Sequence, residues 1–177
     1  MIPVRLFFMA KKSFNTPIIL SILIGAVLVI TIALTSQTPT ISAPIAATPG
    51  AEPTLVVSDT AIDLGTMKVS DERSKDITIT NTGNGPLVLS RVRTSCDCTF
   101  ADLTIGGQTL SFNMEMHNPI ALRQWTGSLA PGESAVLKTI YRPSIMPVQG
   151  SVERMISFNT NDPKNPSVEI TLRAFVE

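Results

Sequence analysis

The run from residue 17 to residue 34, eighteen residues without a charge, most restricts how this chain can fold. A helix of that length is about 27 Å long, close to the roughly 30 Å hydrocarbon core of a bilayer. Lys11 and Lys12 come shortly before the run, and the next basic residue is Lys68. Because basic residues favour the cytoplasmic side of a membrane, the pattern predicts a spanning helix with the N-terminus in the cytoplasm.

A cleaved signal peptide is the alternative interpretation of the same run. Its apolar region usually covers about 7–15 residues, fewer than here, and no clean small-x-small cleavage site follows the run. Prolines recur through the next segment, as expected for an extended spacer. The predicted organisation is a cytoplasmic stub (1–16), a transmembrane signal anchor (17–35), a Pro/Ser/Thr/Ala-rich linker (36–53) and a folded domain (54–177).

Charge is distributed unevenly along the 177 residues, although fourteen basic and fourteen acidic side chains cancel overall. The first fifty residues contain three basic residues and no acid, so the remainder carries 11 − 14 = −3. A mildly acidic domain has no positive field with which to neutralise phosphates, and we expect no nucleic-acid partner. The single histidine excludes a multi-histidine metal site.

Apolar residues in the predicted domain alternate with polar ones, which is the period of a half-buried β-strand. In the stretch 167–176, Ile170 and Leu172 fall on one face, and Glu169 and Thr171 on the other. Predicted strands cover 54–58, 61–65, 76–80, 86–92, 134–141, 154–160 and 167–176. Turns rich in glycine, proline and asparagine lie at 81–86, 130–134 and 161–166. Short strands at this spacing predict an all-β fold, a sandwich of two antiparallel sheets.

Five short motifs follow one another along this domain, and together they resemble a family of bacterial envelope domains of unknown function. The motifs are Leu64-Gly65, the turn from Asn81 to Leu87, Ser95-Cys96-Asp97-Cys98-Thr99, Pro131-Gly132-Glu133 and Thr160-Asn161-Asp162-Pro163. The resemblance implies an immunoglobulin-like fold of the hydin and major-sperm-protein type, and it implies no activity. The sequence departs from the family at Asp97, where glycine is usual, and in a longer connection over 103–127.

Cys96 and Cys98 have the most distinctive chemistry in the domain. Outside the cytoplasm they can form a disulfide, whose very small ring makes it easier to reduce than an ordinary structural bridge. As thiolates they could bind a soft metal such as Cu(I). As a redox-active dithiol they would be assisted by Arg91 and Arg93 and opposed by Asp97. The spacing leaves a structural pair, a copper site and a redox dithiol open.

The segment 111–117 adds Met114, Met116 and His117, whose thioether and imidazole groups could complete a Cu(I) site with the two cysteines. Packing is the alternative, and it is the commoner role of such methionines. On a strand, Phe112, Met114 and Met116 would share one face while His117 would point to the other. We therefore expect no cofactor, with copper as the alternative.

Catalytic motifs are missing from the sequence, and we predict no enzyme. No Gly-x-Ser-x-Gly elbow occurs, and Gly83-Asn84-Gly85 lies in a strand–strand turn rather than in a phosphate loop. The predicted function is that of a membrane-tethered extracytoplasmic module with a non-catalytic binding or structural role. Its expected contacts are the membrane through residues 17–35 and a protein or other envelope partner through loops at 81–86, 94–108 and 117–133. The alternative is copper(I) binding or thiol redox chemistry by the Cys-x-Cys pair.

Overall fold

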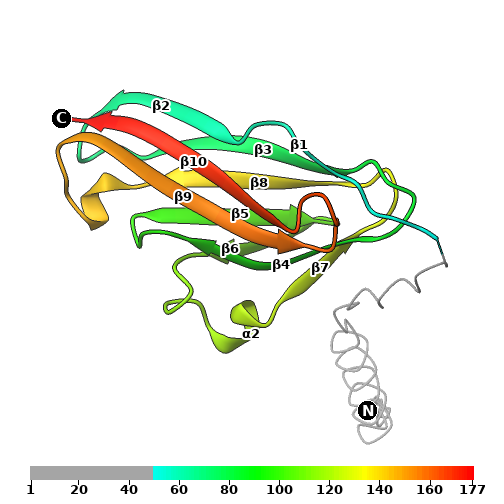
Figure 1. The fold of residues 1–177 in the computed structure, drawn as a ribbon. Coiled ribbons are helices and arrows are strands. Elements are labelled where there is room, and N and C mark those ends of the chain that lie inside the picture. The colour runs from blue at the N-terminus through cyan, green and yellow to red at the C-terminus, as the bar shows by residue number, and fades with distance from the viewer. Residues whose placement is uncertain (1–49) are drawn as a thin grey trace, which may run out of the picture. The chain divides into compact units, whose positions relative to one another are not determined.

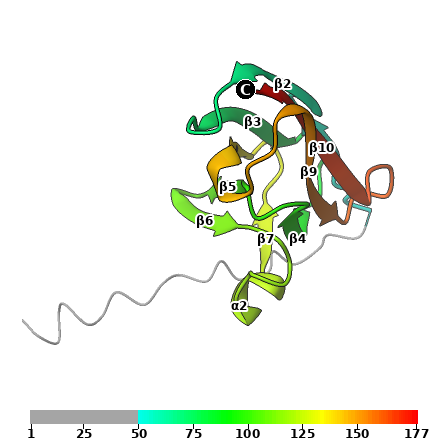
Figure 2. The same cartoon turned by 90° about the vertical axis from the view of Figure 1, so that its left-hand side faces the viewer.

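Residues 50–177 are the part of the chain that the computed structural model describes. They form two five-stranded sheets, ordered β1-β3-β8-β5-β6 and β2-β10-β9-β4-β7 (Figure 1). Figure 2 shows these two layers of strands end-on. The strands are β1 (Leu55–Val57), β2 (Ala61–Met67), β3 (Arg73–Asn81), β4 (Leu87–Thr94), β5 (Thr99–Ile105), β6 (Gln108–Phe112), β7 (Thr126–Leu129), β8 (Ser134–Tyr141), β9 (Gly150–Thr160) and β10 (Ser167–Val176).

Helical structure in the described residues is limited to α2 (Ile120–Arg123) and the 3-10 turn η1 (Pro143–Ile145). Neither α2 nor any other helix in residues 50–177 is long and apolar enough to cross a membrane. The predicted cytoplasmic stub, the transmembrane anchor and the linker up to residue 49 lie outside the described residues. For the domain itself, the predicted all-β sandwich is confirmed.

The predicted strands are recovered, and β8 and β10 have the predicted bounds. Three further strands, β5, β6 and β7, occupy the stretch that the sequence suggested was mainly a long connection. The expectation of purely antiparallel sheets is wrong, because β2 pairs parallel to β10 from Ala61↔Thr171 to Met67↔Val176. The chain leaves the first sheet after β1 and enters the second as β2, and there it runs in the same direction as the C-terminal strand.

The hydrophobic core lies between the sheets and follows the period-two pattern of the strands. On β10, for example, Ile170 and Leu172 are buried while Glu169 is exposed. Trp125, just before β7, packs against this core, and its ring centroid is 5.4 Å from that of Phe112 on β6. The tryptophan thereby fills the space between the edge strands β6 and β7, which belong to different sheets.

Asn81 explains the turn motif at 81–87, because its buried side chain joins three segments of backbone. The Nδ2 group donates to the carbonyl oxygens of Gly85 (2.8 Å) and Leu129 (2.9 Å). The Oδ1 atom accepts from the amides of Gly83 (3.0 Å) and Thr54 (3.4 Å). The motif is therefore structural, and it holds the chain where it enters the domain.

Asp162, in the motif at 160–163, likewise joins separate segments of the chain through its side chain. Its buried carboxylate accepts hydrogen bonds from the side chain of Asn165 (2.9 Å) and from the amides of Leu55 (2.9 Å) and Lys164 (2.8 Å). The hydrogen bonds from the Asn165 side chain and then from the Leu55 amide lower the pKa of Asp162 below its usual value, because they stabilise the charged form. Both motifs thus fix the start of β1, at the end of the sandwich opposite Cys96.

Candidate functional site

Cys96 and Cys98 form a disulfide in the turn between β4 and β5, where the chain crosses from one sheet to the other. Their Cα atoms are 5.2 Å apart. Backbone and side-chain groups hold the turn: the Thr94 hydroxyl (2.9 Å) and the Thr99 amide (3.0 Å) both donate to the carbonyl oxygen of Cys96. In the structure, then, both sulfurs belong to a bridge, and neither is a thiolate that could bind Cu(I).

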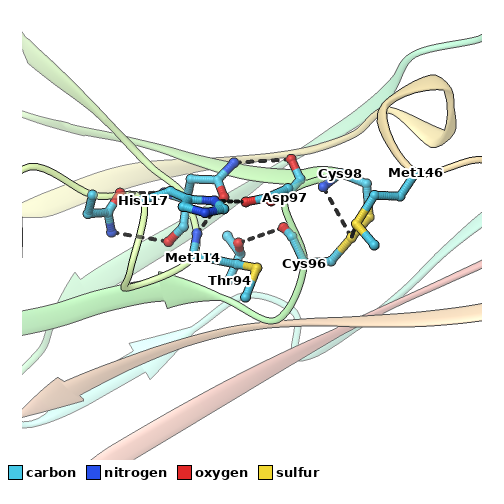
Figure 3. A network of polar contacts seen from close by, with 9 residues as sticks. Thr94, Cys96, Asp97, Cys98, Met114, His117 and Met146 are labelled. Atoms are coloured by element: carbon cyan, nitrogen blue, oxygen red, sulfur yellow. Dashed lines mark hydrogen bonds and ion pairs between the residues drawn. A yellow bond between two sulfur atoms is a disulfide. The ribbon is translucent and has the colours of Figure 1, made fainter.

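The two sulfurs lie in different surroundings. Cys98 is fully buried, whereas Cys96 is 7% exposed. The Nε atom of Arg154 lies 3.2 Å from Cys98 Sγ, and the Sδ atom of Met146 lies 3.6 Å from Cys96 Sγ (Figure 3 shows Met146 beside the bridge). Each sulfur therefore has its own neighbour, a cation for the inner sulfur and a thioether for the outer one.

The cation beside the bridge differs from the ones that the sequence suggested. Arg91 is exposed and lies 3.8 Å from the Glu115 carboxylate, and Arg93 donates to the carbonyl oxygen of Arg91. Arg154, which contacts Cys98 instead, comes from β9 and is 56 residues away in sequence. The sequence did contain a signal for Arg154. On a strand, position 154 falls on the same face as the predicted inward residues Ile156 and Phe158, and an arginine is unusual on an inward face.

The Asp97 carboxylate and Nδ1 of His117 lie within hydrogen-bonding contact of each other (Figure 3). Its backbone is outside the left-handed region, since Arg91 is the only residue other than glycine with a positive φ among those described. The turn therefore does not require the glycine that the family usually has. His117 belongs to the longer connection, so the two departures from the family pattern meet in one contact.

Met114, Met116 and His117 follow β6 rather than lie on it, because the strand ends at Phe112. Reciprocal hydrogen bonds between Asn113 and Asn118 turn the chain there, with the Asn113 amide donating to Asn118 Oδ1 (2.8 Å) and Asn118 Nδ2 donating back (3.1 Å). Met116 is 70% exposed, so the packing interpretation is wrong for this residue. Nowhere in residues 50–177 do three or more His, Cys, Asp or Glu side chains form a group that could hold a metal ion.

A group of exposed apolar side chains lies in the loop 143–149, which joins β8 to β9 at the same end as the disulfide. Ile145 (45%), Met146 (48%) and Val148 (44%) are all exposed in this loop, which we call the apolar loop. It was not among the three predicted interaction loops. The available signal was the segment from Pro143 to Pro147, where the period-two pattern stops but apolar residues continue.

The three predicted interaction loops differ in what the structure makes of them. The turn 81–86 is built into the backbone contacts of Asn81. The stretch 94–108 is mostly the strand β5 with the disulfide turn before it, and 117–133 contains α2 and β7. None of the three presents a loop as apolar as residues 143–149.

Comparison with known proteins gives one family and a set of similar folds. The family model described as "HYDIN/CFA65/VesB-like, Ig-like domain" matches residues 53–175. No curated protein matches the chain. Among solved structures, a protein of unknown function from Porphyromonas gingivalis W83 is similar with 24% identity and a TM-score of 0.53, over 73% of this chain and 50% of that one. This chain thus spans half of that protein's length.

Two other solved structures are similar at lower scores. The ASH/PapD-like domain of human CEP192 has 9% identity and a TM-score of 0.46, over 80% of this chain and 96% of that one. The secreted serine protease VesC from Vibrio cholerae has 14% identity and a TM-score of 0.43, over 72% of this chain and 24% of the protease. At 24% identity, the structure from Porphyromonas gingivalis is evidence for the fold alone.

Proposed function

The chain belongs to the HYDIN/CFA65/VesB-like Ig-like domain family, and we propose that it is a membrane-tethered, extracytoplasmic, non-catalytic module that binds a protein of the cell envelope. The observation that carries the binding role is the apolar loop. Exposed apolar groups gathered in one loop are typical of surfaces that become buried against a partner. Ile145, Met146 and Val148 meet this description.

The extracytoplasmic location is supported by the disulfide between Cys96 and Cys98. Disulfides persist in oxidising compartments and are rare in the cytosol, where thiols are kept reduced. The tether is supported by the apolar run 17–34 and by the basic residues before it. Together these observations favour a domain held outside the membrane.

Site-specific photo-crosslinking in cells tests the binding role. A photoreactive amino acid replaces Val148 in the apolar loop, and a matched control replaces Val136, an exposed valine on β8 with a similar exposed fraction (41% against 44%). We expect a discrete crosslinked protein from position 148 and none from position 136. Equal crosslinking from both positions, or none from position 148, contradicts the proposed binding surface.

Protease accessibility tests the tether and the location. In intact spheroplasts, external protease should degrade the domain, while a cytoplasmic marker protein survives. The membrane-bound protein should keep the native N-terminus. A mature protein that begins near residue 44 would instead show that residues 17–35 belong to a cleaved signal peptide.

A further inference from the structure

Arg154 has surroundings that are unusual for a cation. Its position on β9 falls in the inward-facing row between the buried residues Val152 and Ile156, and the side chain is half-buried. It forms no ion pair with any carboxylate of residues 50–177. Withdrawing a guanidinium from water costs free energy, so its remaining partners must compensate.

Two groups besides backbone face this guanidinium. The ring of Tyr141 lies 5.8 Å from its Cζ atom, and Cys98 Sγ lies 3.2 Å from its Nε atom. The sulfur of a disulfide is a weak acceptor, whereas a thiolate is an anion and forms a much stronger hydrogen bond to a guanidinium. The Arg154 guanidinium therefore stabilises the anionic form of Cys98 more than it stabilises the bridge.

We propose that the Cys96–Cys98 bridge is a site of thiol–disulfide exchange with a fixed polarity, meaning that one sulfur is always attacked and the other always leaves. Dithiols attack Cys96, and Arg154 stabilises Cys98 as the leaving thiolate. The proposal does not depend on partner binding by the apolar loop. It assigns different roles to two cysteines that the sequence leaves equivalent.

Accessibility supports the same polarity. Cys98 is fully buried, so an incoming thiolate can reach only Cys96, which is 7% exposed. The neighbour of Cys96 is the half-exposed Met146, a flexible side chain that can move aside. The Asp97 carboxylate, which would repel an attacking thiolate, is in hydrogen-bonding contact with His117.

The reaction balances with a dithiol as the reductant. One thiolate of the dithiol attacks Cys96 Sγ, a mixed disulfide forms, and the electron pair of the broken bond leaves on Cys98 Sγ beside Arg154. The second thiolate of the dithiol then attacks its own partner sulfur and expels Cys96 as a thiolate. The two cysteines gain two electrons, the dithiol is oxidised to a disulfide, and its protons pass to water or to the released thiolates.

The test measures reduction rates of the oxidised full-length protein, purified in detergent, with excess dithiothreitol as the probe. Aliquots are quenched with acid, and free thiols are alkylated and counted by mass spectrometry. We expect Arg154→Gln to slow reduction by about tenfold, the effect of losing one charge-assisted hydrogen bond in the transition state. Arg154→Lys, which keeps the charge but not the Nε donor, should fall between Arg154→Gln and the wild type.

Arg173→Gln is the matched control, because it removes the same charge from an exposed residue of β10 that pairs with Glu153. It should be reduced at the wild-type rate. A wild-type rate for folded Arg154→Gln, or equal slowing by Arg173→Gln, overturns the proposal.

The wild-type protein alone tests the polarity if Arg154→Gln does not fold. The monothiol glutathione forms a mixed disulfide with one cysteine, which peptide mapping after acid quenching locates. Glutathione on Cys96 supports the proposal. Glutathione on Cys98, or a bridge that excess dithiothreitol does not reduce, overturns it.

Discussion

Single side chains in this domain show how strongly a role depends on surroundings. Asp97 and Asp162 both belong to motifs of the family, yet one is paired with a histidine at the surface and the other is buried among hydrogen-bond donors. Arg154 on β9 and Arg173 on the adjacent strand β10 pair with different residues, and of the two only Arg154 reaches a sulfur atom. A motif therefore identifies where to look, while the contacts decide between a structural and a chemical role.

Asp162→Asn should lower the free energy of unfolding by about 2 kcal/mol at neutral pH, because hydrogen bonds to the charged carboxylate are lost. The pKa of Asp162 is lowered in the folded protein by the Asn165 side chain and the Leu55 amide. This stabilisation is therefore complete above the unfolded pKa of about 3.9 and is lost as the pH falls through the folded pKa. Denaturant unfolding of both proteins from pH 7 downwards measures the difference.

The matched control is Asp59→Asn, which changes an exposed carboxylate between β1 and β2 and should have little effect at any pH. The difference between wild type and Asp162→Asn should shrink at acidic pH. A difference that stays constant down to the lowest pH would contradict the charge-based explanation.

At the scale of elements, turns and irregularities determine how the strands fit together. The turn after β3 packs directly on the backbone that leads into β1. A Cβ atom on Gly85 would lie 2.6 Å from the carbonyl oxygen of Ala51, and one on Gly83 would lie 2.4 Å from that of Glu52. The two glycines are needed for this close approach.

Gly85→Ala should therefore lower the free energy of unfolding by about 1–3 kcal/mol, the usual cost of overpacking. Amide hydrogen exchange should also become faster at Glu52, whose amide donates to Asn84 Oδ1. Thr82→Ala, in the same turn, removes one long, exposed hydrogen bond from the Thr82 hydroxyl to the carbonyl oxygen of Thr54 (3.4 Å) and should change both quantities less than Gly85→Ala does. An unchanged exchange rate at Glu52 in Gly85→Ala would show that the close approach is not needed.

β4 contains an irregularity between Ser90 and Arg93 in its pairing with β9, and Arg91 within it has φ +52°. A left-handed conformation costs a residue with a Cβ atom about 1–2 kcal/mol. An exposed ion pair such as Arg91–Glu115 contributes little to the free energy of unfolding and does not offset this cost. We expect Arg91→Gly to leave the unfolding free energy unchanged or to raise it by up to about 1 kcal/mol. Arg93→Gly, on the same strand without the positive φ, should lower it by about 1 kcal/mol. An equal decrease of the unfolding free energy in Arg91→Gly and Arg93→Gly would contradict this explanation of the irregularity in β4.

At the scale of the whole domain, the two sheets rather than the disulfide provide stability. Only Asp97 separates the bridged cysteines, so the bridge constrains few conformations of the unfolded chain. The chain-entropy relation gives about 1.5 kcal/mol for so short a loop. The core between the sheets involves every strand, and the two cysteines are only two of its many buried members.

Reduction of the wild-type protein should therefore lower the unfolding free energy by no more than about 2 kcal/mol and leave the strand signal in circular dichroism intact. The double variant Cys96→Ala/Cys98→Ala serves as the control, since reductant should not change its stability. Loss of the folded signal on reduction would show that the bridge is essential to the fold. Survival of the fold is also what a reversible exchange site requires.

Local patterns in the sequence were sufficient for seven of the ten strands of the domain and for the turns at 81–86, 130–134 and 161–166. Period-two alternation and the Asn, Gly and Pro residues act over a few neighbours, so β8 and β10 could be predicted with their bounds. The short strands β5, β6 and β7 lack a strong alternation. β5 and β6 form a local hairpin with each other, but the pairings of β5 with β8 and of β7 with β4 join segments that are distant in sequence. The same holds for the parallel pairing of β2 with β10.

The candidate site shows the same division. The spacing of Cys96 and Cys98 singled out the two residues with special chemistry and left open whether they are bridged. Only the tertiary structure brought Arg154 to one sulfur and Met146 to the other, over 56 and 50 residues of sequence. Sequence spacing determines which residues are close along the chain. The different surroundings of Cys96 and Cys98 come from distant side chains, which only the packing of the two sheets brings close to the sulfurs.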